Sequence, residues 1–153
     1  TCDKSLIRIA INNLINNAIK YGTPNKTIHG SLKKLDGGFE FRIINEGIGI
    51  PEDKLDSVFD EFTRFDKIGA GGSGLGLYLV KKIVAMHNGS IRAESGYIIS
   101  DKFVTYKMIR KNPELYDIDI EDKKLRKFAT FILFIPGYTL SDSGIDTKKE
   151  NKK

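Results

Sequence analysis

Apolar residues in the first twenty positions recur at intervals of three and four, which is the spacing of one face of a helix. The pattern predicts a helix over residues 3–20. Gly22 and Pro24 are expected to end it, because neither residue continues a helix well. The expected apolar face consists of Leu6, Ile7, Ala10, Ile11, Leu14 and Ala18.

Other segments carry the β-branched and aromatic residues that are typical of strands. The sequence Asp36-Gly37-Gly38 lies between two of them and predicts a hairpin turn, because glycine tolerates positive φ. The expected strands cover residues 26–35, 38–45, 90–95 and 128–136.

Two further helices are predicted from hydrophobic spacing. A short amphipathic helix is expected over residues 51–62, with Pro51 at its start, and a longer helix over residues 75–87, closed by Asn88 and Gly89. In the short helix the expected inward residues are Leu55, Val58, Phe59 and Phe62.

Helices that alternate with strands and an antiparallel hairpin predict an α/β two-layer sandwich. A chain of 153 residues with 40% hydrophobic composition fits one domain with a real core. That domain is expected over residues 1–138, and the lysine-rich segment 139–153 is expected to be a solvated, disordered tail.

Charge and cysteine content exclude few function classes. The net charge of +5 would suit a polyanionic partner, but several lysines lie in the tail. The single cysteine, Cys2, rules out an internal disulfide, and no Cys/His cluster suggests zinc, so a reducing, cytoplasmic setting is expected. No membrane-length apolar run or signal peptide is visible, and the chain opens on Thr1 directly before a helix, so we expect a piece of a longer protein.

Polar residues on the first helix form a candidate binding face. Asn13, Asn17, Lys20 and Tyr21 follow an i, i+4, i+7, i+8 pattern and share one side of the helix. The face could simply be solvated, although asparagine is a poor helix former there. Alternatively it binds metal and phosphate, since an amide oxygen suits Mg²⁺ and a lysine can neutralise phosphate charge.

A glycine-rich loop over residues 69–76 leads directly into the most apolar helix. Gly69, Gly71 and Gly74 match the dinucleotide-binding pattern, but the preceding segment is charged and aromatic rather than an apolar strand. No G-K-[ST] sequence follows, so a P-loop is excluded. The remaining alternatives are a flexible surface loop and a phosphate-binding loop at a helix N-terminus.

Segments 12–22, 45–62 and 71–91 resemble, in order and spacing, the N box, the first glycine box with the F box, and the second glycine box of sensor histidine kinases. The chain is thus similar to the catalytic, ATP-binding domain of that family. The resemblance implies a Bergerat-type fold, with helices on one face of a mixed, largely antiparallel sheet. DNA gyrase, mismatch-repair ATPases and certain chaperones share it.

The resemblance also implies roles for individual residues of the N box and first glycine box. Asn17 would coordinate Mg²⁺, with Asn13 beside it on metal or phosphate, and Lys20 and Tyr21 would contact the phosphates and ribose of ATP. The adenine pocket would be formed by Asn45, Gly47, Ile48, Gly49 and Ile50.

Further residues would hold the phosphates from the lid of about residues 63–73. Arg64 would approach the γ-phosphate and form, with Asn13 and Lys20, the implied catalytic set. Phe59 and Phe62 of the F box are included in the nucleotide-binding set, with core and lid-hinge packing as the alternative. The phosphate-binding set also contains Gly72, Ser73, Gly74, Leu75, Gly76 and Leu77.

Two features depart from the family pattern. Asn45 stands where most members carry an aspartate that accepts a hydrogen bond from adenine. A neutral bond should be weaker by about 1 kcal/mol, so we expect lower affinity rather than lost specificity. Residues 97–127 replace a short turn, and are expected to form either an elaborated loop or extra hairpin at the sheet edge, or a docking surface.

The chemistry implied is presentation of ATP rather than its hydrolysis. Hydrolases of this fold place a glutamate four residues before the metal-binding asparagine, where this chain has Asn13, which cannot act as a base. The resemblance implies a phosphoacceptor histidine on a separate helical dimerisation domain and a response-regulator receiver domain as second partner. His29 and His87 are expected to be structural.

Other functions remain as alternatives. They are a stand-alone serine kinase of the anti-sigma type, a Bergerat-fold hydrolase, and a degenerate nucleotide-binding docking module. A nucleic-acid-binding module would explain the charge but not the asparagines or glycines, so no nucleic-acid partner is expected. Contact with a membrane is expected only through missing parts of a parent protein.

Overall fold

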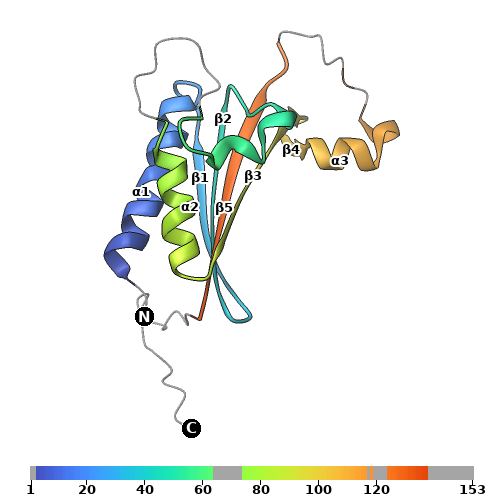
Figure 1. The fold of residues 1–153 in the computed structure, drawn as a ribbon. Helices are drawn as coiled ribbons and strands as arrows, with labels where there is room; N and C mark the ends of the chain where they lie inside the picture. The colour runs from blue at the N-terminus through green and yellow to red at the C-terminus, as the bar shows by residue number, and fades with distance from the viewer. Residues whose placement is uncertain (1–2, 64–73, 117, 119–123, 138–153) are drawn as a thin grey trace.

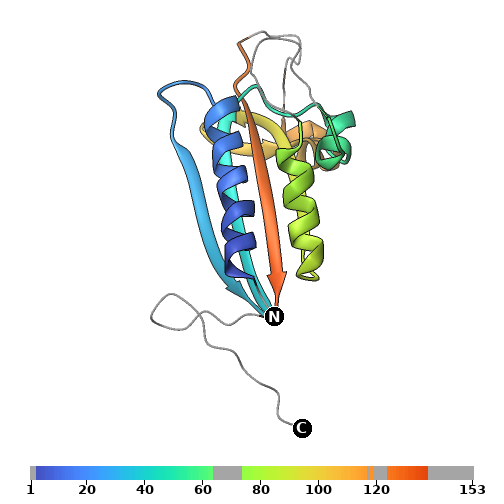
Figure 2. The same ribbon diagram turned by 60° about the vertical axis from the view of Figure 1, so that its left-hand side comes forward.

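The computed structural model describes residues 3–63, 74–116, 118 and 124–137. Within them the strands form one sheet in the order β1-β2-β5-β3-β4, and the two longer helices lie along one face of it (Figures 1 and 2). The helices are α1 (Lys4–Tyr21), α2 (Gly76–Met86) and α3 (Tyr106–Lys111), and the 3₁₀ turns are η1 (Glu52–Lys54), η2 (Ser57–Phe59) and η3 (Pro113–Leu115). The strands are β1 (Ile28–Leu35), β2 (Gly38–Gly47), β3 (Ser90–Ile99), β4 (Lys102–Thr105) and β5 (Lys127–Pro136).

The architecture is the expected α/β sandwich. All pairings between the described strands are antiparallel, so the sheet has none of the parallel pairing that a mixed sheet would contain. The predicted hairpin at Asp36 is confirmed: Gly37 has φ of +79°, and β1 pairs with β2 from Leu35 opposite Gly38 onward.

The helix α1 is fixed at its beginning by a side-chain cap and by α2. The Asp3 carboxylate accepts hydrogen bonds from the backbone N–H groups of Ser5 and Leu6, at 2.9 and 3.2 Å. The Asp3 N–H donates to Nε2 of His87 at 3.1 Å, while Nδ1 of His87 donates to the Ile83 carbonyl oxygen at 2.7 Å. Nε2 of His87 therefore joins the two helices and Nδ1 binds the last turn of α2, which confirms the structural role of this histidine.

The core lies between the helices and the sheet. Because directly opposed residues in antiparallel strands project from the same face, alternate residues of β2, β5 and β3 meet the apolar sides of α1 and α2. None of the helices in the described ranges combines the length and apolar character needed to cross a bilayer. The core includes Leu14, Ala18, Ile43, Val80, Ile83, Val84, Phe131, Leu133 and Ile135.

The prediction of one amphipathic helix over residues 51–62 is wrong. The segment forms two single 3₁₀ turns, in which Leu55 N–H donates to Glu52 O and Asp60 N–H donates to Ser57 O, at 3.3 and 3.0 Å. The adjacent residues Val58 and Phe59 are both buried. Two adjacent buried side chains suit a tight turn better than they suit a helix, in which buried residues recur every three or four positions.

Phe62 does not point inward as expected. Its backbone has φ of +59°, and its side chain is 67% exposed. The expected packing of Phe62 in the core is therefore wrong.

The segment after residue 96 forms regular structure at the edge of the sheet. The strand β3 continues to Ile99, beyond the expected end at residue 95, and a turn with positive φ at Ser100 and Asp101 leads into β4. The short helix α3 then packs against β3 and β4. The described residues therefore contain the extra hairpin that was one of the expectations for this segment.

Candidate functional site

The four asparagines of α1 divide into two pairs. Asn12 and Asn16 are exposed, whereas Asn13 and Asn17 are half-buried. Nδ2 of Asn13 donates to the Ile9 carbonyl oxygen at 2.9 Å. Oδ1 of Asn13 faces α2, because a Cβ placed on Gly76 would lie 3.0 Å from it. The polar face is therefore directed at the beginning of α2 rather than only at bulk solvent.

The beginning of α2 has the features of an anion site. Gly74 has φ of +72°, and no side chain of the described residues caps the helix. The first backbone N–H groups of a helix have no partner within the helix and carry partial positive charge, so they favour an anion. Leu77, one residue into the helix, packs against the core. The described part of the glycine loop thus meets Asn13 at Gly76.

The other end of α1 contacts the loop that follows β2. Gly22 pairs with Gly47 in an antiparallel bridge, and Ile48 N–H donates to the Tyr21 carbonyl oxygen at 3.4 Å. A Cβ on Gly47 would lie 2.1 Å from that same oxygen, so only glycine fits there. Since Asn13 and Tyr21 are eight residues apart, α1 connects the two halves of the site over about 12 Å.

Asn45 lies on the helix side of β2, directly opposite Ala129, and is 3% exposed. Its Nδ2 has no hydrogen-bond partner among the described residues. A buried donor without a partner is costly in free energy, so a ligand acceptor beside it would be stabilising. Oγ1 of Thr130 is also buried without a described partner, but it opposes Ile44 and lies on the other face.

The loop after Gly47 is held by the sheet. Gly49 has φ of +69°, and a Cβ there would lie 3.2 Å from Oγ of Ser95. Ile50 N–H donates to the same hydroxyl oxygen at 2.9 Å, and the Ser95 hydroxyl donates to the Phe128 carbonyl oxygen. Ile50 is buried in the core, whereas Ile48 is 57% exposed. Only Ile48 of these two isoleucines is available to a ligand.

The remaining predicted site residues are exposed, packed in the core or outside the described residues. Lys20 is exposed, with Nζ 4.9 Å from the centroid of the Tyr21 ring. The Phe59 ring packs edge-to-face on Phe131 and is 5% exposed, so the packing alternative is confirmed and a direct nucleotide contact is not. Phe62 stays near the glycine loop, where a Cβ on Gly74 would lie 3.1 Å from its Cα. Arg64, Gly72 and Ser73 lie outside the described residues.

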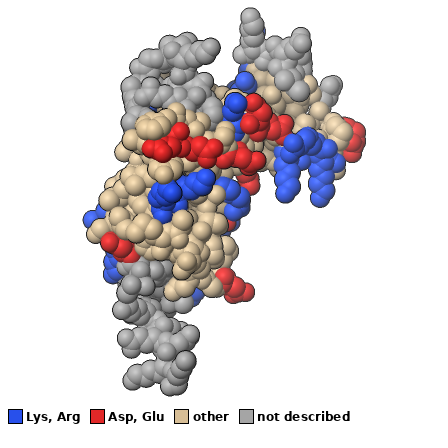
Figure 3. All heavy atoms as spheres, viewed as in Figure 1, with Lys and Arg blue, Asp and Glu red and all other residues tan. Residues whose placement is uncertain are grey.

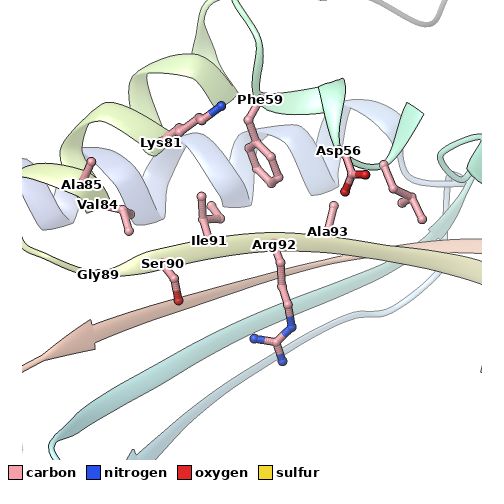
Figure 4. Close-up of a pocket in the computed structure, with 11 residues that line it drawn as sticks. Asp56, Phe59, Lys81, Val84, Ala85, Gly89, Ser90, Ile91, Arg92 and Ala93 are labelled. Atoms are coloured by element: carbon pink, nitrogen blue, oxygen red, sulfur yellow. The ribbon is translucent and has the colours of Figure 1, made fainter. Parts of the chain in front are cut away.

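A separate groove of about 390 Å³ lies between α2, the two 3₁₀ turns and β3 (Figure 4). Phe59 lines it together with Asp56, Lys81 and Arg92, and Phe59 is its only member from the predicted nucleotide-binding set. A second cavity of about 330 Å³ lies beside the end of α1, and is lined by Lys20, Lys26 and Glu46 among others. Neither cavity is lined by the asparagines of α1.

The charged residue next to Asn45 is held by a partner distant in sequence. Glu46 forms two hydrogen bonds with Arg126, both at 2.9 Å, and Lys26 lies 3.9 Å from the same carboxylate. The hydrogen bonds from Arg126 lower the pKa of Glu46, and Glu46 and Asp101 together raise the pKa of Arg126. Glu46 therefore remains charged at neutral pH.

The donor set fits magnesium of the kind that shares its coordination with phosphate. Within the described ranges no group of three acidic, histidine or cysteine side chains could hold a metal ion. Asn17 and Asn13 carry neutral amide oxygens, and a metal bound to them would share its coordination with phosphate oxygens and water. This is a coordination that Mg²⁺ accepts.

The supporting residues Ser95 and Arg126 were missed in the sequence. Each acts over a long separation, 45 residues from Ser95 to Ile50 and 80 residues from Arg126 to Glu46. Local periodicity carries no signal for such pairs. A serine in a strand and an arginine in a charged segment look like ordinary solvated residues.

Residues 2–136 match the family described as Histidine kinase-, DNA gyrase B-, and HSP90-like ATPase. The sensor-like histidine kinase SenX3 of Mycolicibacterium smegmatis is 37% identical over 127 residues, which are 81% of this chain and 33% of SenX3. The sensor protein kinase WalK of Staphylococcus aureus is 44% identical over 88 residues, 54% of this chain and 21% of WalK. The chain thus spans a third or less of the length of these relatives.

Solved structures have the same fold. The mycobacterial sensor histidine kinase MprB superposes with a TM-score of 0.58 at 27% identity, over 88% of this chain and 74% of that chain. The catalytic domain of histidine kinase ThkA gives 0.61 at 23% identity, over 88% and 69%. Full-length ShkA in complex with AMPPNP gives 0.60 at 20% identity, over 88% and 22%. The likeness to ThkA and ShkA shows the fold alone.

Proposed function

Because the chain belongs to the histidine kinase-, DNA gyrase B- and HSP90-like ATPase family, we propose that it binds Mg-ATP between α1, α2 and the loop after β2. It would then present the γ-phosphate to a histidine on another domain of a sensor kinase. The relatives SenX3 and WalK are sensor kinases, which supports this function over the serine-kinase alternative.

The observation that carries the proposal is the position of α1 between two partial sites. Asn13 faces the beginning of α2, and Tyr21 contacts the glycines after Asn45. The first is suited to phosphate and the second to a base. One helix therefore sets the distance between them.

Asn45 fits an adenine base. Its Oδ1 can accept a hydrogen bond from the exocyclic amino group of adenine, while its buried Nδ2 has no hydrogen-bond partner among the described residues. Gly47 has no side chain to crowd the amide, since a Cβ there would lie 3.0 Å from Nδ2, and the exposed Ile48 offers an apolar contact.

At the phosphate end, the residues of this chain would bind and orient the phosphates of ATP and their metal ion. Asn17 and Asn13 would hold the metal, Lys20 would neutralise phosphate charge, and the N–H groups at Gly76 would bind an oxygen. Bound Mg-ATP supplies the phosphoryl group that is transferred. Arg64, Gly72 and Ser73 are proposed as further contacts from the lid. Such positioning and charge stabilisation account for most of the catalysis in phosphoryl transfer.

The acceptor is proposed to lie on a separate helical dimerisation domain of the parent protein. His87 is engaged at both ring nitrogens, and His29 lies on β1 with its ring 6.0 Å from that of Phe103. Asn13 offers no base for activating water. A response-regulator receiver domain would take the phosphoryl group onward, and the site would work in the cytoplasm, where ATP is supplied.

The proposal is tested with radiolabelled ATP. The 153-residue chain should bind a non-hydrolysable ATP analogue saturably, yet form no phosphohistidine and release no phosphate above background. Binding without turnover follows from a site that has phosphate ligands but lacks an acceptor and a base. Robust phosphohistidine formation on the chain, or steady ATP hydrolysis, would contradict it.

A further inference from the structure

We propose that the segment of residues 97–127 positions the loop of residues 46–52, and so sets the affinity of the base side of the nucleotide site. The inference rests on the proposed nucleotide site and assigns a role to a segment outside the phosphate-binding residues. Contacts from this segment and from neighbouring Ser95 hold the loop near its start, its middle and its end.

The first contact fixes the start of the loop. Arg126 makes the two hydrogen bonds to Glu46 described above, and its NH1 donates to Asp101 at 3.0 Å. Glu46 lies between Asn45 and Gly47, and its side chain is 12% exposed. A planar guanidinium that binds both carboxylate oxygens restrains that carboxylate in position and orientation.

The second contact acts in the middle of the loop through Ser95. The Ser95 hydroxyl oxygen accepts the hydrogen bond from Ile50 N–H. The side chain of Tyr106, the first residue of α3, interacts with that of Ser95, and its ring packs edge-to-face on Tyr97 with centroids 5.7 Å apart. The loop, β3 and α3 therefore meet around the Ser95 side chain.

The third contact fixes the end of the loop. NH1 of Arg110, on α3, lies 2.6 Å from Oε1 of Glu52. Acidic side chains cover the two 3₁₀ turns and basic side chains gather over α3, so opposite charges face each other where the segment meets the loop (Figure 3). Lys111 on the same helix makes no ion pair within the described residues.

The loop between these contacts contains most of the base side of the site. Gly49 has positive φ, and Ile48 is exposed, so the loop has few apolar anchors of its own before Ile50. Loosening the contacts should let the backbone of Gly47–Ile50 move away from a bound base. The phosphate side, at Asn13 and Gly76, would remain in place because α1 and α2 pack directly on one another.

The test compares Arg126→Met, Arg110→Met and Tyr106→Phe with the control Lys111→Met, by calorimetric titration of the chain with AMPPNP and ADP. The Arg126 and Arg110 variants should each weaken binding by roughly two- to fivefold, the range expected for one partly exposed ion pair. The affinities for AMPPNP and ADP should fall by the same factor, and the ratio of affinities with and without Mg²⁺ should stay as in wild type. Raising the ionic strength should reduce the difference in nucleotide affinity between these variants and wild type, because salt screens the ion pairs.

Hydrogen exchange without nucleotide gives a second readout. The Ile50 amide should exchange faster in the Tyr106 and Arg126 variants than in wild type, while amides of β5 stay protected. Unchanged affinity and unchanged Ile50 exchange in all three variants would overturn the proposed positioning. If the folded wild-type chain binds neither nucleotide, the proposed site fails as well, whatever the exchange results.

Discussion

Asn45 is a single buried amide that decides how the base side of the site recognises its ligand. It lies on the helix side of β2 with Nδ2 unpartnered among the described residues, next to Gly47, where a Cβ would lie 3.0 Å from Nδ2. The sequence predicted a base-binding role for this position, but not its burial. The burial strengthens a hydrogen bond that Oδ1 accepts from a ligand, because little water competes for it there.

Replacing Asn45 with aspartate should tighten nucleotide binding. A carboxylate accepts a charge-assisted hydrogen bond from the exocyclic amino group, worth about 1 kcal/mol more than the neutral bond. Affinity should rise by roughly fivefold, measured by calorimetry at pH 7 with AMPPNP. If Asn45→Asp bound the analogue with unchanged or lower affinity, the assigned hydrogen bond would be wrong.

Replacing Gly76 with alanine should affect thermal stability and nucleotide binding differently. A Cβ there would lie 3.0 Å from Oδ1 of Asn13, so Gly76→Ala must displace that amide by a few tenths of an ångström. Alanine also has the higher helix propensity, by up to about 1 kcal/mol. We expect unchanged or higher thermal stability, together with weaker Mg-nucleotide binding. A variant that binds as tightly as wild type would show that Asn13 does not contact the ligand.

The helix α1 and the strand β2 are the elements that assemble the site. Hydrophobic periodicity predicted both because it is a local property of the chain, and the polar face of α1 followed from the same spacing. The short segment of residues 51–62 was mispredicted, since two adjacent buried residues can satisfy either a helix or two 3₁₀ turns. Phe62 was mispredicted because positive φ at a residue other than glycine has no clear local signature.

The link between β2 and Arg126 should appear in the pH dependence of stability. Hydrogen bonds from Arg126 lower the pKa of Glu46 below its ordinary value of 4.5. The stabilisation is therefore present above that value, and is lost as pH falls through the lower pKa of the folded state. Between pH 6 and pH 3, the free energy of unfolding in urea should fall less in Arg126→Met than in wild type. Equal losses in the two proteins would contradict this link.

For the molecule as a whole, the sandwich and the motif residues could be predicted, and the supports around them could not. Ser95 and Arg126 act across 45 and 80 residues, and the sequence of the segment 97–127 did not distinguish a hairpin from a longer loop. These contacts depend on which strands become neighbours, which only the tertiary fold determines. The predicted contacts at Arg64, Gly72 and Ser73 stay predictions.

The central claim is that the half-buried asparagines of α1, Asn13 and Asn17, bind a magnesium-nucleotide complex. Calorimetric titration with AMPPNP, with and without Mg²⁺, tests it on wild type, Asn17→Ala and the matched control Asn16→Ala, whose side chain is exposed. Wild type and Asn16→Ala should bind saturably and lose affinity without Mg²⁺, whereas Asn17→Ala should bind weakly and respond little to the metal. Equal binding by both variants, or no binding by folded wild type, would contradict the claim.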